Sequence, residues 1–286
     1  MNDLIINFTP TGMIPTKEVT PFVPILESEI VEDVFKAWEL GITMVHIHAR
    51  NPKTGESSND IEIYGNIIEG IRSFAPDLVI CVSLSGRIFK EFKDRAAPLE
   101  LEGRLKPDMG SLTLSSLNFN KQASINEPKT IIGLAKRMKE LGIMPELEAF
   151  DVGMLNYAKY LIKKEIISAP YYFNLIFGNI ACAQADLLHA GIMVNDLPGN
   201  SIWSFGGIGD FQLMMNNIAI VFNGGVRVGL EDNIYFDAKR TKLAKNIDLI
   251  KRIHNIAGVH DRKIMSSKKL RKLLNLKDGN GSYGLL

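Results

Sequence analysis

The chain has 286 residues, of which 46% are hydrophobic and 23% charged, and its formal net charge is +1. This balance is typical of a globular protein, and the near-neutral charge argues against a surface for nucleic acid or anionic membrane. Asp3 stands where a secretory signal would be basic, and no apolar run has the length of a membrane span. The two cysteines, Cys81 and Cys182, are too few for a disulfide framework. We therefore expect a cytoplasmic enzyme with reduced thiols that acts on a small molecule.

Strand-like and helix-like segments alternate along the chain. Short apolar runs predict strands at 4–8, 43–48, 78–82, 111–114, 145–150, 171–177, 201–205 and 226–230. Amphipathic patterns predict helices at 28–40, 60–74, 98–105, 129–141, 154–167, 181–190, 211–222 and 239–256. Ser28 is the expected cap of the first helix, and Gly41 is expected to end it.

About eight strand–helix pairs without a linker predict an α/β fold of the (β/α)₈ TIM-barrel type, a catalytic domain over residues 1–258. A doubly wound open sheet would require a glycine-rich dinucleotide loop after its first strand, where this chain has only one glycine, Gly12. Residues 259–286 are expected to form a C-terminal helical extension. Its basic amphipathic helix at 266–274 would pack on the barrel or on a neighbouring subunit.

Two histidines, His46 and His48, end the second predicted strand. Side chains two residues apart on a strand point the same way, and the carboxyl ends of barrel strands carry the active site. Two imidazoles in that position favour one bound metal ion, although hydrogen-bonded structural histidines are the alternative.

A carboxylate at the end of the last predicted strand can complete this ligand set. Arg227 and Glu231 share the inward face of that strand, and barrel closure places the last strand two positions from the second. Glu231 can therefore reach His46 and His48, and a structural ion pair between Arg227 and Glu231 is the less favoured alternative.

Other polar residues also fall on inward strand positions. A purely structural barrel would fill these with aliphatic side chains, but the chain has Ser83, Ser85, Ser111, Thr113, Glu146 and Glu148. Their convergence predicts a polar site at one end of the barrel.

The segment after the seventh predicted strand is rich in glycine, with Gly206, Gly207 and Gly209 before Asp210. Backbone N–H groups of such a turn can bind a phosphate at a helix start, and barrels often bind phosphate there. A tight turn capped by Asp210 explains the same residues equally well. A phosphate site would point to a phosphoester or to a cofactor such as coenzyme A.

Three runs of sequence resemble the β-keto acid cleavage enzymes, which include the 3-keto-5-aminohexanoate cleavage enzyme: VHIHARNP at 45–52, PELEAFDVG at 145–153 and VRVGLEDN at 226–233. The resemblance covers nearly the whole chain. It implies a zinc-dependent (β/α)₈ barrel, usually a homotetramer, that joins a β-keto acid to acetyl-CoA and splits the adduct by retro-Claisen chemistry into acetoacetate and a new acyl-CoA.

The resemblance also assigns roles to individual residues. His46, His48 and Glu231 match the zinc ligands, and Asp232, assisted by Arg227, matches the base that removes a proton from the substrate. Ser83 and Glu146 match polar supporting residues, with Glu148 as the alternative to Glu146.

The chain departs from this family at two places. Members that ferment lysine carry an acidic residue just after the glycine of the first strand, where this chain has Met13 and Ile14 after Gly12. We therefore expect a substrate without an ammonium group, with an apolar or otherwise polar tail, unless Glu18 or Glu27 replaces the missing carboxylate. The third strand ends in Ser85, Gly86 and Arg87 instead of two small residues, which makes Arg87 a candidate contact for substrate or CoA.

Two other classes of function remain open from the residues. Two histidines and a carboxylate also serve Fe(II) oxygenases and divalent-metal aldolases. The other class is a non-catalytic binding barrel, which the inward charges of Arg227, Glu231 and Asp232 argue against.

Overall fold

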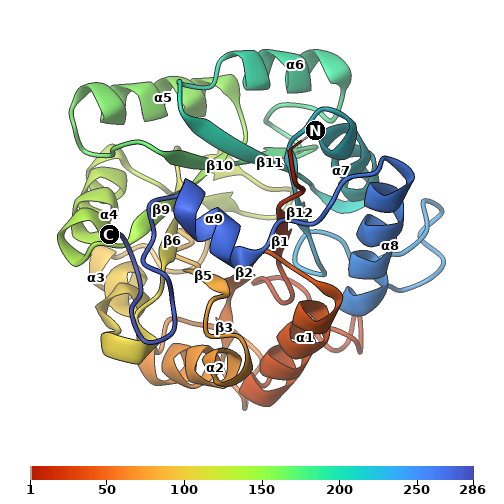
Figure 1. The fold of residues 1–286 in the computed structure, drawn as a ribbon, viewed down its shortest axis with the longest axis horizontal. Coiled ribbons are helices and arrows are strands. Elements are labelled where there is room, and N and C mark those ends of the chain that lie inside the picture. Colours follow the sequence, from red (N-terminus) through yellow and green to blue (C-terminus); the bar gives the residue numbers. More distant parts are fainter. Residues whose placement is uncertain (1) are drawn as a thin grey trace.

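The computed structural model describes residues 2–286, and within them eight parallel strands close into a barrel (Figure 1). Around the barrel the strands are β1 (Ile6–Phe8), β12 (Gly225–Val228), β11 (Ser201–Gly207), β10 (Tyr171–Phe177), β9 (Met144–Ala149), β6 (Met109–Thr113), β5 (Val79–Val82) and β2 (Met44–Ile47). The predicted TIM-barrel fold is confirmed. β12 is the neighbour of β1, and β1 is the neighbour of β2, as closure requires.

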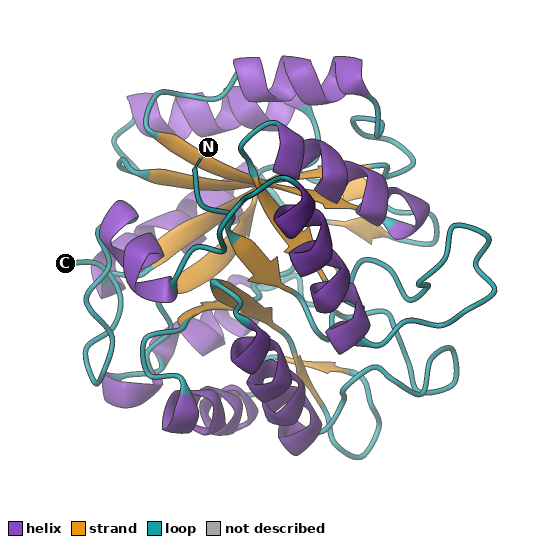
Figure 2. Cartoon of the chain, turned by 45° about the vertical axis from the view of Figure 1, so that its right-hand side comes forward, coloured by secondary structure: helices purple, strands orange, loops and turns teal. Residues whose placement is uncertain are grey.

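Helices surround this barrel and cover its outer face (Figure 2). They are α1 (Glu27–Leu40), α2 (Ile61–Phe74), α3 (Phe92–Ala96), α4 (Pro128–Leu141), α5 (Val152–Lys163), α6 (Leu187–Asn195), α7 (Gln212–Val221) and α8 (Asn246–Val259). The main core lies between strands and helices, where the outward side chains Val45, Ile47 and Val226 meet residues such as Ile30 and Ile67. No helix among residues 2–286 is long and apolar enough to cross a bilayer.

Two short antiparallel hairpins follow the carboxyl ends of barrel strands. One pairs β3 (Ala49–Arg50) with β4 (Ser57–Ser58) after β2, and the other pairs β7 (Leu117–Asn118) with β8 (Ala123–Ser124) after β6. Because both follow strand ends, they border the face on which barrel enzymes carry their sites.

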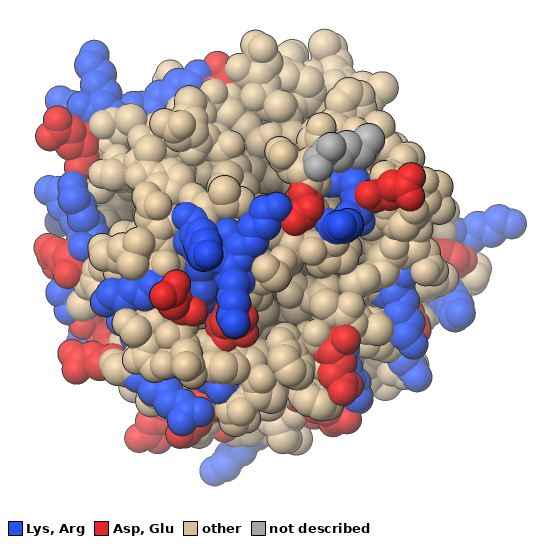
Figure 3. All heavy atoms as spheres, in the orientation of Figure 1, with Lys and Arg blue, Asp and Glu red and all other residues tan. Residues whose placement is uncertain are grey.

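The C-terminal extension closes the opposite end of the barrel. Helix α9 (Ser267–Leu273) begins where the side chain of Ser266 accepts a hydrogen bond from the backbone of Lys269, and its apolar side packs on a cluster of inward residues from the strands. The buried members from the extension are Met265, Leu270, Leu274 and Leu276. Basic side chains gather over α9 on this face of the molecule (Figure 3), and Lys268, Lys269 and Lys272 are exposed.

Several predicted helix boundaries are wrong. The expected helix at 98–105 is instead two 3₁₀ turns that follow α3, Ala97–Glu100 and Gly103–Leu105, and Gly103 has a φ of +56° that an α-helix does not allow. Helix α6 starts six residues later than the predicted position 181, because the carboxylate of Asp186 accepts a hydrogen bond from the His189 N–H and caps the helix there.

Helices α1 and α8 also start at other residues than predicted, because side chains accept hydrogen bonds from the backbone there. Ser28 is not the cap of α1, since Leu26 stands at the cap position and the carboxylate of Glu29 accepts from the N–H groups of Ile25 and Leu26. Helix α8 begins at Asn246 instead of 239, because Asp237 accepts from the backbone of Thr241 and Lys242 and holds that stretch in a turn.

Candidate active site and metal centre

His46, His48 and Glu231 meet at the carboxyl end of the barrel. His46 lies in β2 and His48 just beyond it, and both side chains are buried. Their Nε2 atoms are 3.3 Å apart, and the Nε2 of His48 is 3.1 Å from Oε1 of Glu231. One ligand atom from each residue lies within 4.8 Å of the others. The structure thus brings together three residues of which His48 and Glu231 are 183 positions apart in the sequence.

The donor atoms of this cluster fit a divalent cation. In a tetrahedral zinc site with Zn–N bonds of about 2.0–2.1 Å, two ligand nitrogens stand about 3.3 Å apart, which matches the two imidazoles. The second carboxylate oxygen of Glu231, Oε2, is buried and has no hydrogen-bond partner within residues 2–286. A buried carboxylate oxygen without a partner is costly unless a cation satisfies it.

The charges around the cluster favour metal ligation at Glu231 and His48. Burial alone would raise the pKa of Glu231, but Arg227 and the two histidines hold it well below its usual range, so the carboxylate is ionised. Burial lowers the pKa of His48, and that leaves its imidazole neutral at pH 7. For His46, burial acts in the same direction, but Glu146 and Glu231 outweigh it and raise the pKa to about 9.

Arg227 holds both acidic residues at the end of β12. Its Nη2 donates to Oε1 of Glu231 at 2.7 Å, and its Nε donates to Oδ2 of Asp232 at 2.9 Å. Burial raises the pKa of Asp232, Arg227 partly opposes that effect and Glu231 adds to it, so the net pKa is above the usual value. Asp232 is therefore a fixed carboxylate that is more basic than a surface aspartate, which suits a general base.

Glu146 lies behind His46, on the side away from the other ligands. Its Oε2 is 2.5 Å from Nδ1 of His46, and its Oε1 accepts from Asn7 at 2.7 Å. The Sγ of Cys81 donates to Oε2 at 3.2 Å, and burial raises the pKa of this thiol, which stays protonated. Although burial raises the pKa of Glu146, His46 lowers it to about 2. A carboxylate on Nδ1 directs Nε2 of the imidazole toward a metal.

Glu146 and Glu148 are alternatives from the sequence, and they have different surroundings in the structure. Glu148 accepts from Thr113 Oγ1 at 2.7 Å, and its Oε1 is 3.7 Å from Nη1 of Arg227. Ser83 is buried just after β5, but its hydroxyl makes no hydrogen bond to the other candidate residues in the described part of the chain.

Sequence reasoning missed Asn7 and Cys81 as partners of Glu146. The available signal for Asn7 was a polar residue in the middle of the apolar run 4–8. Nothing in the sequence distinguished Cys81 from an ordinary core cysteine.

The glycines predicted to follow the seventh strand are closely packed, and two of them lie within that strand. Gly206 and Gly207 belong to β11, where a Cβ on Gly206 would lie 3.2 Å from Arg227 Cδ and one on Gly207 would lie 2.5 Å from the backbone of Phe211. Gly209 has a φ of +59°, and its N–H donates to the carbonyl of Asp232 at 2.7 Å. These contacts support the tight-turn reading, and phosphate binding here stays a prediction.

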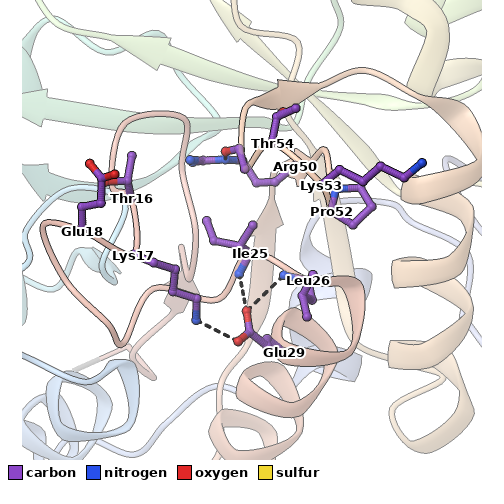
Figure 4. Close-up of a pocket in the computed structure, with 11 residues that line it drawn as sticks. Thr16, Lys17, Glu18, Ile25, Leu26, Glu29, Arg50, Pro52, Lys53 and Thr54 are labelled. Atoms are coloured by element: carbon purple, nitrogen blue, oxygen red, sulfur yellow. Dashed lines mark hydrogen bonds and ion pairs between the residues drawn. The ribbon is translucent and has the colours of Figure 1, made fainter.

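A cavity of about 400 Å³ lies beside the loop that follows β1 (Figure 4). Its lining includes Lys17, Glu29 and Arg50. Arg50 donates to the carbonyls of Gly12, Pro15 and Gly55, and so joins this loop to the β3–β4 hairpin. None of the metal-site residues lines this cavity.

Gly12 connects the loop to the metal cluster. It has a φ of +66°, and a Cβ there would lie 2.6 Å from Cγ of Glu231. Ile14, which follows in the same loop, is 54% exposed. The absence of a side chain at Gly12 therefore sets the position of Glu231.

The fold and the site together define a (β/α)₈ barrel with a His–His–Glu cluster and an arginine-held aspartate at the carboxyl ends of its strands. A family model for beta-keto acid cleavage enzymes matches residues 3–276. The 3-keto-5-aminohexanoate cleavage enzyme of Fusobacterium nucleatum is 33% identical over 279 residues, which cover 97% of this chain and 99% of the relative. The chain belongs to the beta-keto acid cleavage enzyme family, as its motifs predicted.

Further comparisons agree with this assignment. The 3-oxoadipate:acetyl-CoA acetyltransferase of Cupriavidus necator is 33% identical over 275 residues, which cover 95% of this chain and 94% of the relative. Among solved structures, the apo structure of ObcA matches with a TM-score of 0.74 at 17% identity, over 89% of this chain and 65% of that one. The chain thus spans less than two thirds of that solved chain, and the likeness shows the fold alone.

Proposed function

We propose that the protein condenses a β-keto acid with acetyl-CoA and splits the adduct into acetoacetate and a new acyl-CoA. The observation that carries this proposal is the bond from Arg227 to Asp232, beside the His–His–Glu cluster. The Cupriavidus relative is a 3-oxoadipate:acetyl-CoA acetyltransferase, which supports acetyl-CoA as the cosubstrate here.

Asp232 takes a proton from the carbon between the ketone and the carboxylate of the keto acid. Arg227 keeps the carboxylate in place through its Nε. The resulting carbanion attacks the thioester carbonyl of acetyl-CoA and forms a C–C bond. The CoA thiolate then moves to the former ketone carbon, and the bond between that carbon and the original α-carbon breaks. The proton returns from Asp232, which leaves acetoacetate and the new thioester.

We propose zinc as the metal, held by His46, His48 and Glu231. When bound, it would polarise the oxygens of the keto acid and make the flanking C–H more acidic. An Fe(II) oxygenase would use a similar ligand set, but such enzymes generally have a double-stranded β-helix, whereas this chain has a barrel of alternating strands and helices. Metal analysis of the purified protein separates the two readings, since about one zinc per chain supports ours and iron with oxygen consumption opposes it.

The phosphate groups of CoA are proposed to lie near Gly206, Gly207 and Gly209, at the start of α7. Arg240 and Asp210, which pair at 2.8 Å, are the exposed charged residues beside that turn. Hydrogen–deuterium exchange at these three backbone amides, measured with and without CoA, tests the proposal. Slower exchange with CoA supports it, and unchanged exchange at all three amides would contradict it.

A homotetramer is proposed because the family resemblance implies one, and exposed apolar side chains of α6 and α7 support an interface between subunits. Leu188 is 70% exposed and Phe222 is 64% exposed, and Leu187, Ile192, Met214 and Val221 are exposed near them in sequence. Large apolar side chains gathered on a surface are typical of an interface between proteins. Light scattering after size exclusion tests the oligomeric state.

A cytoplasmic location is also proposed. The two free thiols, Cys81 and Cys182, support it because a reducing compartment keeps cysteines unpaired.

The decisive assay couples acetoacetate formation to a panel of β-keto acids with acetyl-CoA. Acetoacetate that appears only when both substrates are present, together with a new acyl-CoA in equal amount, supports the proposal. A protein that binds these compounds without turning them over would instead be a binding barrel.

A further inference from the structure

Arg87 is a half-buried cation without a partner at the mouth of the barrel. It follows β5, and its guanidinium carbon lies 3.5 Å from the centroid of the Phe119 ring. Its Nε is buried and has no hydrogen-bond partner, and in the described chain no carboxylate forms an ion pair with it. A buried charge without a partner destabilises a fold, so such a charge calls for an explanation.

Neighbouring arginines do not share this property. Arg95 donates to the carbonyl of Leu84 at 2.8 Å, to that of Ile125 at 3.2 Å and to Oδ1 of Asn126 at 2.8 Å. Arg50 donates to three carbonyls, and Arg227 donates to two carboxylates. Nη1 of Arg227 is also without a hydrogen-bond partner, but of these four arginines only Arg87 makes no side-chain hydrogen bond at all within residues 2–286.

The segment that carries Arg87 is held in place. The backbone N–H of Arg87 donates to Oγ of Ser85 at 3.3 Å, and the carbonyl of Gly86 accepts from Ile125 at 3.2 Å. A Cβ on Gly86 would lie 2.3 Å from the carbonyl oxygen of Ile125, so only glycine fits this contact. Phe119, on which the guanidinium stacks, packs edge-on against Phe150. The guanidinium is thus positioned before any ligand arrives, which favours binding.

The charges that act on Arg87 belong to the active site. Burial lowers the pKa of Arg87, and Glu231, Asp232 and Glu148 act in the opposite direction. These carboxylates attract the guanidinium, but none of them forms an ion pair with it in the described residues. Arg87 enters from β5, next to β2, whereas Asp232 enters from β12, on the far side of β1. Both residues follow the carboxyl ends of their strands, so Arg87 and Asp232 lie at the same end of the barrel.

We propose that Arg87 is a specificity-determining residue that binds an anionic group at the far end of the β-keto acid, so that β-keto dicarboxylates are the preferred substrates. This inference rests on the proposed function. The reacting carboxylate is not the expected ligand, because it must lie beside Asp232 and the metal cluster, with which Arg87 makes no pair. The same cation would repel an ammonium-tailed substrate, in agreement with the lack of a carboxylate at Ile14.

The test compares two six-carbon keto acids that differ only at the tail, 3-oxohexanedioate and 3-oxohexanoate, each with acetyl-CoA. The variants are Arg87→Gln and, as a matched control, Lys90→Gln, which removes an exposed cation from the same loop. We expect the wild-type protein to favour the diacid by about 10–100-fold in kcat/KM, since a charge-assisted pair has that strength. Arg87→Gln should abolish this preference, mainly through KM for the diacid. In Arg87→Gln, the kcat/KM for the monoacid and the KM for acetyl-CoA should each change by less than about threefold. Lys90→Gln should behave as wild type.

Three results would overturn the proposal: no preference for the diacid in the wild-type protein, an equal loss on both keto acids in Arg87→Gln, or a rise confined to the KM for acetyl-CoA. These differ from failure of the proposed function, in which neither keto acid yields acetoacetate. Metal content and a thermal melt establish that Arg87→Gln is folded. If that variant does not fold, inhibition of the wild-type protein decides the matter, because hexanedioate should inhibit at least about tenfold more strongly than hexanoate.

Discussion

The Nε of Arg227 donates to Oδ2 of Asp232 across 2.9 Å, although a regular strand would turn residues five positions apart to opposite faces. The strand β12 ends at Val228, and Gly229 turns the chain with a φ of +157°. A Cβ on Gly229 would lie 2.0 Å from the carbonyl oxygen of Thr9, so the turn is pressed against β1. Both Glu231 and Asp232 reach Arg227 as a result.

Asp232→Asn should abolish most turnover and leave the fold and the metal in place. The amide cannot accept the substrate proton, and a lost general base typically lowers kcat by about 10²–10⁴-fold. The measurement is acetoacetate formation alongside metal content and a thermal melt. Asp278→Asn, which alters an exposed aspartate of the C-terminal extension, is the control and should keep full activity. Full activity in Asp232→Asn would remove this residue from the mechanism.

Gly12→Ala should weaken metal binding by displacing Glu231. Its Cβ would lie 2.6 Å from Cγ of Glu231, whereas Gly55, which also has a positive φ, would place a Cβ no nearer than 4.0 Å from Ile25. Both variants should lose about 1–2 kcal/mol of stability from the left-handed backbone, but only Gly12→Ala should lose metal. Equilibrium dialysis with zinc measures the difference, and equal zinc affinity in the two variants would contradict the argument.

Glu146→Gln should lower metal affinity by about 10–100-fold, because the variant no longer fixes His46 through Nδ1. Glu148→Gln is the matched control, since Glu148 contacts Thr113 and lies near Arg227 but bonds to neither histidine. A competition titration with a chromogenic chelator reports both affinities. The role of Glu146 would be refuted by wild-type affinity in a folded Glu146→Gln protein.

Zinc affinity should rise with pH up to about 9 in the metal-free protein. Glu146 and Glu231 outweigh burial and raise the pKa of His46 to about 9, so its imidazole must release a proton before Nε2 can bind a metal. Below that pH the association constant should increase about tenfold per pH unit, and above it the constant should level off. Calorimetry in buffers of different ionisation enthalpy should detect about one proton released at pH 7, and no release would contradict the prediction.

Arg271→Ala should destabilise the closed end of the barrel. Arg271 donates to both carboxylate oxygens of Asp108 at 2.9 and 2.8 Å, and both side chains are buried. Removing one partner leaves a buried charge and costs about 3–5 kcal/mol. Urea unfolding measures the loss, and Lys272→Ala, at the exposed neighbouring position, should change little. Unchanged stability in Arg271→Ala would show that the extension does not depend on this pair.

The sequence by itself determined the barrel and much of the candidate site. Local periodicity identifies alternating strands and helices, because the apolar spacing of each element follows from its own geometry. The same reasoning placed His46 and His48 on one face of β2. Barrel closure then put Glu231 within reach of them, since the last strand always neighbours the first.

Only the tertiary structure decided which polar groups pair and which stay free. The bonds from Asn7 and Cys81 to Glu146 cross the barrel, and no local pattern reports them. The starts of α6 and α8 were set by Asp186 and Asp237, whose side chains compete for backbone N–H groups. The isolation of Arg87 is likewise invisible in the sequence, because strand register and loop packing determine what surrounds a charge, and both depend on residues far apart in the chain.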